Sequence, residues 1–324
     1  MVSGREARVR WEERVMFKSV SCRAAGGALR VVSKRDGGRL SVATKGLIAA
    51  GFVFGLYALP LGSVTSEPAK ATGGEWPAQV NADYNITFNG FDIGSFKFQS
   101  AISGRGYVLD GDAELSALLG AFKWRGLTRA SGKVSSRNPQ PAGYTFTFKS
   151  SSRSGSVKLG FNKDRVSNVS LVPPIPDQAD TVPVEKKHLK GALDPLTAVM
   201  ALTRPVGDKG PCERVIPVFD GKQRFDLRLS YRRQELIREN RRSGQPGVAI
   251  VCNVRYVPIA GYSPSEAEQM AENTGIEVTL RPVPSANLYV PYEIRIPTIA
   301  GSVTLSSNRI DIRISDRERI ALGH

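Results

Sequence analysis

The side chains that most often carry out catalysis are scarce in this sequence. Of its two histidines, His324 is the last residue, which leaves His188 to activate a serine or cysteine nucleophile. His188 lies between Lys187 and Leu189, just before a predicted helix, where a surface or capping role is the more natural interpretation. The sequence also contains no Gly-x-Ser-x-Gly motif. We therefore predict no catalytic residues.

Two further patterns give only weak support for chemistry. Asp110 and Asp112 could form a carboxylate pair or half of a metal-binding loop, but a turn at a strand end is the better interpretation. Residues 126–133 are similar to a phosphate-binding loop, but the gap between its glycines is one residue too long. In addition, Val134 stands where that motif requires Ser or Thr. We expect no metal site and no cofactor, because no ligand set has the required spacing.

The strongest charged cluster is a group of arginines around one end of a predicted hairpin. Such a cluster suits contact with anionic lipid headgroups, lipopolysaccharide or acidic glycans. A solvated hairpin tip is the alternative interpretation. Nucleic-acid binding is not expected of a chain that, as argued below, is exported. The candidate contact residues are Arg228, Arg232, Arg233, Arg238, Arg241 and Arg242.

Three cysteines bear on the compartment of the protein. Cys22 lies in a segment that export would remove, which leaves Cys212 and Cys252 as an even pair. In an oxidising compartment such a pair most often forms a structural disulfide, and two unpaired buried thiols are the alternative. Redox catalysis and zinc binding are poorly supported, because the sequence has neither a Cys-x-x-Cys motif nor a histidine near these cysteines.

The N-terminal part has the features of an export signal. The formal net charge is +15, and residues 1–71 contribute +7 of it, with 12 Lys and Arg against 5 acids. A basic flank leads into residues 46–66, which carry no charge, and Ala69-Lys70-Ala71 offers a small-x-small cleavage pattern. The apolar core, about 22 Å long as a helix, is short for a bilayer core of roughly 30 Å.

A cleaved signal peptide is therefore our first interpretation, and an uncleaved membrane anchor formed by residues 46–66 is the second. In both cases residues 72–324 lie outside the cytoplasm. The expected location is the periplasm, with the domain either released or anchored to the inner membrane.

Residues after the leader alternate between apolar and polar side chains, which is typical of strands. Asp194 before Pro195 predicts a helix over residues 195–203, and Ser263 precedes a second candidate over residues 264–273. Residues 113–122 fit either a short helix or an irregular strand. The predicted strands are residues 84–88, 93–98, 144–148, 157–161, 215–219, 224–231, 248–256, 292–296, 303–305 and 310–314.

These elements predict a mainly β fold: an antiparallel curved sheet or barrel-like single domain with one or two short helices, preceded by a hydrophobic export helix. A proline-rich stretch at residues 173–177 suits an extended crossing between two halves of the sheet. The expected organisation is a disordered basic lead at 1–45, a signal or anchor region at 46–71, a linker at 72–82, a β-rich domain at 83–316 and a tail at 317–324.

The predicted strands constrain the disulfide. If residues 215–256 form a simple three-strand meander, Cys212 and Cys252 lie two strands apart, or about 9–10 Å. A disulfide needs Cα atoms roughly 4.4–6.8 Å apart. The bridge therefore requires residues 209–211 to fold over the face of the sheet.

Several stretches taken together resemble a bacterial envelope family, domain-of-unknown-function family 3108. The resemblance covers residues 80–316 and implies a periplasmic β-rich single domain, with a half-open or closed barrel-like sheet around a helix. It implies no reaction. The matching stretches are residues 84–90, 93–94, 182–184, 188–198, 212–214, 218–227, Cys252, Tyr256 and 258–262.

Three functional hypotheses follow. The first is a non-enzymatic envelope protein whose curved sheet holds an apolar or amphiphilic ligand such as a lipid, because many inward side chains have only one firmly predicted helix to cover them. The second is a structural or assembly partner of envelope proteins or anionic polysaccharide, acting through sheet edges and the arginine-rich tip. The third is a glycan-active enzyme that relies on Asp110, Asp112 and Asp226. The expected partners are a lipid or another envelope component.

Overall fold

A computed structural model of the chain describes most of the sequence that follows the predicted leader. The described residues are 76–117, 120, 122–135, 139–175, 180–205, 210–237, 247–314 and 318–323. They belong to one compact unit, Ala71–His324. The predicted lead, signal or anchor region and cleavage site lie outside these residues. No helix in the described part of the chain is long and apolar enough to cross a membrane.

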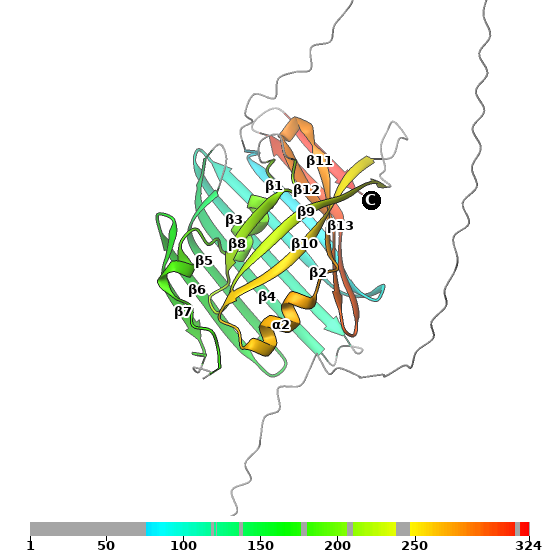
Figure 1. Cartoon of the computed structure of the whole chain (residues 1–324). Coiled ribbons are helices and arrows are strands. Elements are labelled where there is room, and N and C mark those ends of the chain that lie inside the picture. Colours follow the sequence, from blue (N-terminus) through cyan, green and yellow to red (C-terminus); the bar gives the residue numbers. More distant parts are fainter. Residues whose placement is uncertain are drawn as a thin grey trace, which may run out of the picture. The chain divides into compact units, whose positions relative to one another are not determined.

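The described residues form one antiparallel sheet of fourteen strands (Figure 1). Two meanders, β1 to β7 and β8 to β13, are joined because β1 pairs with β13, and β14 pairs with β13 off this path. The strands are β1 Gln79–Phe88, β2 Phe91–Ser103, β3 Gly106–Ala117, β4 Phe122–Val134, β5 Pro139–Ser150, β6 Ser154–Asn162, β7 Arg165–Val172, β8 Arg214–Phe219, β9 Arg224–Ile237, β10 Gly247–Ala260, β11 Ile276–Val283, β12 Leu288–Thr298, β13 Gly301–Ile314 and β14 Glu318–Gly323.

Alternation explains why these segments form strands. In β5, Tyr144 and Phe146 face the core, and in β6 Val157 and Leu159 do the same. Side chains two apart in a strand lie on one face, so each strand contributes a row to the interior. The antiparallel prediction and most of the predicted strands are confirmed.

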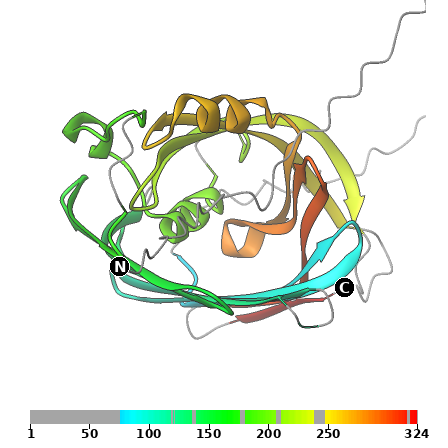
Figure 2. The ribbon, with the colours of Figure 1, turned by 90° about the horizontal axis from the view of Figure 1, so that it is seen from below.

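Two short helices accompany the sheet. α1 (Pro195–Leu202) begins at Asp194, whose Oδ1 accepts a hydrogen bond of 2.8 Å from the Thr197 backbone N–H. The sheet curls around α1, while α2 (Pro264–Glu272) lies outside it against β10 (Figure 2). Both helices are confirmed as predicted. Two 3₁₀ turns, η2 (Lys186–Leu189) and η4 (Pro284–Ala286), complete the elements discussed below.

The sheet does not close into a barrel, because its edge strands β7 and β8 do not pair with each other. Instead, a short segment bridges the two edges: Lys190 pairs with Arg165 of β7, and Leu193 pairs with Val218 of β8. The backbone hydrogen bonds from Leu193 to Pro217 and from Phe219 to Leu193 are both 2.9 Å. Of the two predicted forms, a curved sheet or a barrel-like domain, the open curved sheet is the observed one. We call residues 190–193 the bridging segment.

The two edges also meet through side chains. At Gly221, in the turn between β8 and β9, an added Cβ would lie 2.5 Å from Val157 Cγ1 of β6. Gly221 has a φ of 109°, a conformation that favours glycine. The turn between β8 and β9 is thus packed against the opposite half of the sheet.

The first half of the segment 113–122 is strand rather than helix: Ala113–Ala117 continue β3, and Phe122 begins β4 opposite Ala117. Cross-strand pairing of Leu115 with Trp124 on one side and with Gly94 on the other outweighs the local helix preference there. Residues 118, 119 and 121 lie outside the described residues. β1 begins inside the predicted linker, and β14 occupies the predicted tail.

Candidate ligand-binding site

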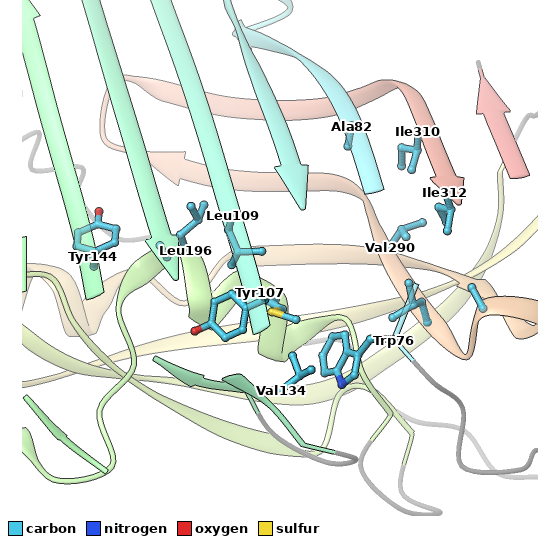
Figure 3. Packing of buried hydrophobic residues seen from close by; sticks show 14 of the residues in the cluster. Trp76, Ala82, Tyr107, Leu109, Val134, Tyr144, Leu196, Val290, Ile310 and Ile312 are labelled. Carbon is cyan, nitrogen blue, oxygen red and sulfur yellow. The ribbon is translucent and has the colours of Figure 1, made fainter. Parts of the chain in front are cut away.

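An apolar cavity of about 170 Å³ lies between α1 and the strands where the two meanders join. Figure 3 shows part of its wall: Trp76, Ala82 of β1, Val290 of β12 and Ile310 of β13. The cavity is lined by Trp76, Pro77, Val80, Ala82, Tyr84, Phe96, Phe98, Ser100, Ile102, Val199, Met200, Thr203, Leu288, Val290, Pro291, Ile294, Leu305 and Ile310.

The apolar character of the cavity follows from alternation in the strands that form it. Val80, Ala82 and Tyr84 of β1 all point inward, since they are two residues apart. Tyr84 brings a hydroxyl into this wall, and the hydroxyl donates a hydrogen bond of 3.0 Å to the Pro291 carbonyl oxygen. Burial raises the pKa of Tyr84 well above its usual value, so the phenol stays neutral. The wall thus presents an uncharged surface to whatever enters.

A buried arginine lies beside this cavity. Arg204, two residues beyond the end of α1, is only 3% exposed, and its guanidinium carbon lies 4.1 Å from the centre of the Trp76 ring. Its Nη1 donates a hydrogen bond of 3.4 Å to the Asn287 carbonyl oxygen. Burial lowers the pKa of Arg204 to about 10, so the side chain still carries its charge at neutral pH.

A buried acid lies at the opposite end of α1. Asp194 is fully buried, and burial raises the pKa of its carboxyl to about 6, although hydrogen bonds from Thr197 act in the opposite direction. Next to it, the hydroxyls of Tyr107 and Thr197 are 2.9 Å apart. This end of the helix is therefore a polar network inside the core.

A second, wider cavity of about 800 Å³ lies at the gap between the edges of the sheet. The bridging segment and Ala201 of α1 form one side of it, so α1 separates it from the apolar cavity. Its wall mixes apolar side chains with the opposite charges of Lys163, Asp164, Glu213 and Arg214. This mixture does not assemble a nucleophile and base, and we assign it no chemistry.

The predicted arginine cluster is described only in part. Arg232 and Arg233 both form ion pairs with Glu277 of β11, the latter at 3.2 Å. Neighbours in a strand normally face opposite sides, but a bulge at this point of the β9–β10 pairing brings both side chains to the same acid. Arg228 is exposed on the same strand. Arg238, Arg241 and Arg242 lie outside the described residues, so their role in ligand contact stays a prediction.

The other sequence candidates have structural roles. The turn predicted at Asp110 and Asp112 is wrong, because both residues lie inside β3 and are held there by pairing with β4. Asp110 pairs with Arg129 and Asp112 with Arg125, each at 2.7 Å, on the solvent side of the sheet. His188 Nδ1 accepts a hydrogen bond of 3.1 Å from the Glu185 backbone N–H at the start of η2, which confirms its capping interpretation. No group of three potential metal ligands of the His, Cys, Asp and Glu types occurs in the described parts of the chain.

The predicted disulfide joins Cys212 and Cys252, whose Cα atoms are 5.3 Å apart. β8, β9 and β10 do form a meander, and Cys252 lies opposite Tyr231 of β9. Cys212 lies two residues before β8, outside the strand, and comes within bonding distance of Cys252 although β9 lies between β8 and β10. Lys209 of the predicted fold-over at residues 209–211 lies outside the described residues. Both cysteines are fully buried in a core cluster with Ala198 of α1.

Sequence reasoning proposed a ligand inside the curved sheet, but it did not place the cavity and it did not find Arg204. The alternation of apolar and polar residues indicated which side chains of β1 and β2 point inward. A cavity, however, depends on the distance between elements that face each other, which the sequence does not give. Arg204 gave no signal, because its stacking partner, Trp76, is distant in the sequence and precedes the first strand.

Comparison with known proteins gives one match. The family model described as "Protein of unknown function (DUF3108)" matches residues 83–306. No curated protein and no solved structure matches the chain.

Proposed function

The chain belongs to the DUF3108 family of proteins of unknown function, and from this premise we propose that it is an exported cell-envelope protein that binds an amphiphilic ligand. The apolar part of the ligand, such as an acyl chain of a lipid, lies in the cavity beside α1. The observation that carries the proposal is the cavity wall, which is apolar on every contributing element apart from Ser100, Thr203 and the Tyr84 hydroxyl.

The size of the cavity suits a segment of one hydrocarbon chain. An engineered apolar cavity of about 150 Å³ stays dry and binds benzene, and this one measures about 170 Å³. Left empty, an apolar cavity of this volume costs about 4 kcal/mol of stability, at roughly 24 cal/mol per Å³. A ligand that fills it therefore stabilises the fold. The remainder of a lipid extends beyond the cavity.

The state of the candidate catalytic carboxylates favours a binding function over catalysis. The three carboxylates that a glycan-active enzyme would use are each held by an arginine: Asp110 by Arg129, Asp112 by Arg125 and Asp226 by Arg224. Each of these carboxylates is therefore engaged by a guanidinium of the protein itself rather than left free for a substrate.

The periplasm is the proposed location. The basic, apolar and small-residue order of residues 34–71 supports export. The buried Cys212–Cys252 disulfide supports it independently, because such bonds persist in oxidising compartments.

Lipid extraction and native mass spectrometry of the purified protein test the binding proposal. Ala82 lines the cavity, so Ala82→Leu fills part of the space that the ligand would occupy. We expect co-purifying amphiphile in the wild-type protein and less in Ala82→Leu, together with a higher denaturation midpoint for the ligand-free variant. The matched control is Ala101→Leu, on an exposed position of β2. The proposal fails if wild-type protein carries and takes up no amphiphile, or if both variants keep the same load.

One observation favours the assembly hypothesis as a second candidate. β7 is an edge strand, and its Val169 and Val172 are 40% and 58% exposed. Exposed edges with apolar side chains are templates for pairing with another chain. Val169→Lys blocks such pairing, so the variant should recover fewer envelope proteins after crosslinking in cells than wild type. Equal recovery counts against this candidate.

A further inference from the structure

Arg204 carries a buried charge that no acid among the described residues compensates. Its Nε and Nη2 are buried, and no described residue accepts a hydrogen bond from either. Its two contacts are the stacked Trp76 ring and one long hydrogen bond to Asn287. Buried charges are normally paired, because removing them from water is costly. Among the described residues, two donor nitrogens of Arg204 thus lack an acceptor, and only the Trp76 ring faces its charge.

The end of α1 does not fill that place. A helix C-terminus offers carbonyl oxygens and a partial negative charge. Arg214 already uses this end: its guanidinium donates to the carbonyl oxygens of Ala201 and Arg204, the latter at 2.8 Å. Arg214 therefore acts as the cationic cap of α1, and Arg204 remains without an acceptor for two of its nitrogens.

Three residues next to Arg204 line the cavity. Its chain neighbour Thr203, its stacking partner Trp76 and Leu288, which follows its acceptor Asn287, all line the cavity. We propose that Arg204 is the headgroup site of this cavity and binds the carboxylate or phosphate of an anionic amphiphile whose chain lies in the cavity. This inference rests on the proposed function and names the class of its ligand.

Trp76 takes part in this recognition. Its indole ring lines the cavity on the one hand and covers the guanidinium on the other. The electron-rich ring face occupies the position of a weak anion. An anionic headgroup replaces it there, so the ring has to shift when ligand binds, and its hydrogen bond of 3.0 Å to the Ser135 carbonyl oxygen changes. The fluorescence of Trp76 therefore reports binding at Arg204.

The test uses the full chain with Trp11→Phe and Trp124→Phe, which leaves Trp76 as the single tryptophan. Palmitate, hexadecyl phosphate, hexadecanol and inorganic phosphate are titrated separately, and Trp76 emission and affinity are measured. We expect at least one of the two anionic amphiphiles to bind about 10- to 100-fold more tightly than hexadecanol, the range given by hydrogen bonds to charged groups. The stronger of the two identifies the headgroup as carboxylate or phosphate.

Variants at position 204 separate this inference from the proposed function. Arg204→Gln should remove the preference for anionic amphiphiles and leave hexadecanol binding unchanged, whereas Arg204→Lys should keep part of the preference. Arg313→Gln, at an exposed position of β13, is the control for loss of one charge. If hexadecanol binds as tightly as both anionic amphiphiles, the inference is overturned and the proposed function stands. If no amphiphile binds, both fail. Inorganic phosphate bound as tightly as hexadecyl phosphate also overturns the inference.

Stability provides a second readout. Removal of an uncompensated buried charge should not destabilise the ligand-free protein. We therefore expect Arg204→Met to keep or raise the denaturation midpoint. A lowered midpoint, with an unchanged ligand preference in Arg204→Gln, would show a purely structural role and contradict the inference.

Discussion

Two buried charges lie at the ends of α1, and their surroundings differ. Asp194 accepts a backbone hydrogen bond at the helix N-terminus, where the helix dipole also favours a negative charge. Arg204 lies just past the C-terminus, where Arg214 has already taken the free carbonyl oxygens. The fold therefore supplies a donor to one oxygen of the Asp194 carboxyl, while its burial favours the neutral acid. For the charge of Arg204 we propose that the ligand supplies the partner.

At the residue scale, Asp194 should make stability depend on pH. Its carboxyl has a pKa of about 6 in the folded chain against 3.8 as an ordinary value. Below pH 3.8 it is neutral whether the chain is folded or unfolded, and this neutral state favours the folded chain most. As pH rises from about 4 to 6, the unfolded chain ionises first and stability is lost, by about 3 kcal/mol at roughly 1.4 kcal/mol per pKa unit.

Asp194→Asn keeps a good N-cap residue without the titrating group. The variant should match wild type near pH 4 and exceed its free energy of unfolding above pH 6. Chemical denaturation of both proteins from pH 4 to pH 8 measures this difference directly. A difference that stays constant across this range would contradict the expected titration of Asp194.

The sequence predicted the role of Asp194 but not that of Arg204. Asp194 was predicted as a helix cap because Asp before Pro is a local signal. Arg204 was not singled out, because nothing next to it in the sequence indicates burial against Trp76. Local chemistry can be read along a chain, whereas burial depends on distant partners.

At the element scale, the alternation of apolar and polar side chains predicted most strands. The spacing between strands predicted that the disulfide requires the chain near Cys212 to leave the plane of the meander. The segment 113–122 shows the limit of this reasoning. Its composition favours a helix, yet Leu115 pairs with Trp124 across strands, and that contact cannot be seen without the register. The bulge that brings Arg232 and Arg233 to Glu277 is equally a property of the paired strands.

The disulfide ties β10 to the chain before β8, and its cysteines are 40 positions apart in the sequence. A crosslink over a loop of this length is expected to stabilise the folded chain by about 4 kcal/mol, chiefly by restricting the unfolded chain. Cys212→Ala with Cys252→Ala should lower the free energy of unfolding by about 2–4 kcal/mol. Denaturant titration of this variant, with reduced wild type alongside, checks the effect. Equal stability of all three forms would contradict it.

At the scale of the whole domain, the sheet encloses α1 without closing. Its edges are joined by the bridging segment, through Lys190 on one side and Leu193 on the other. The sequence placed an extended crossing at residues 173–177, upstream of this segment, and gave no sign that residues 190–193 would pair with both edges, because their partners Arg165 and Val218 belong to different meanders. The cavity follows from the same arrangement, since it lies where the meanders join.

Export is the property on which the proposed envelope function depends, and the intact mass of the protein tests it. The described domain begins after the predicted cleavage site at Ala71. Protein from the periplasmic fraction, kept free of reductant, should have the mass of a chain that starts at Thr72 and lacks two hydrogens, because cleavage removes the leader and Cys212 is bonded to Cys252. Reduction should restore the two hydrogens. A full-length mass in the membrane fraction would instead establish residues 46–66 as an anchor, and free thiols in that sample would remove the oxidising compartment from the proposal.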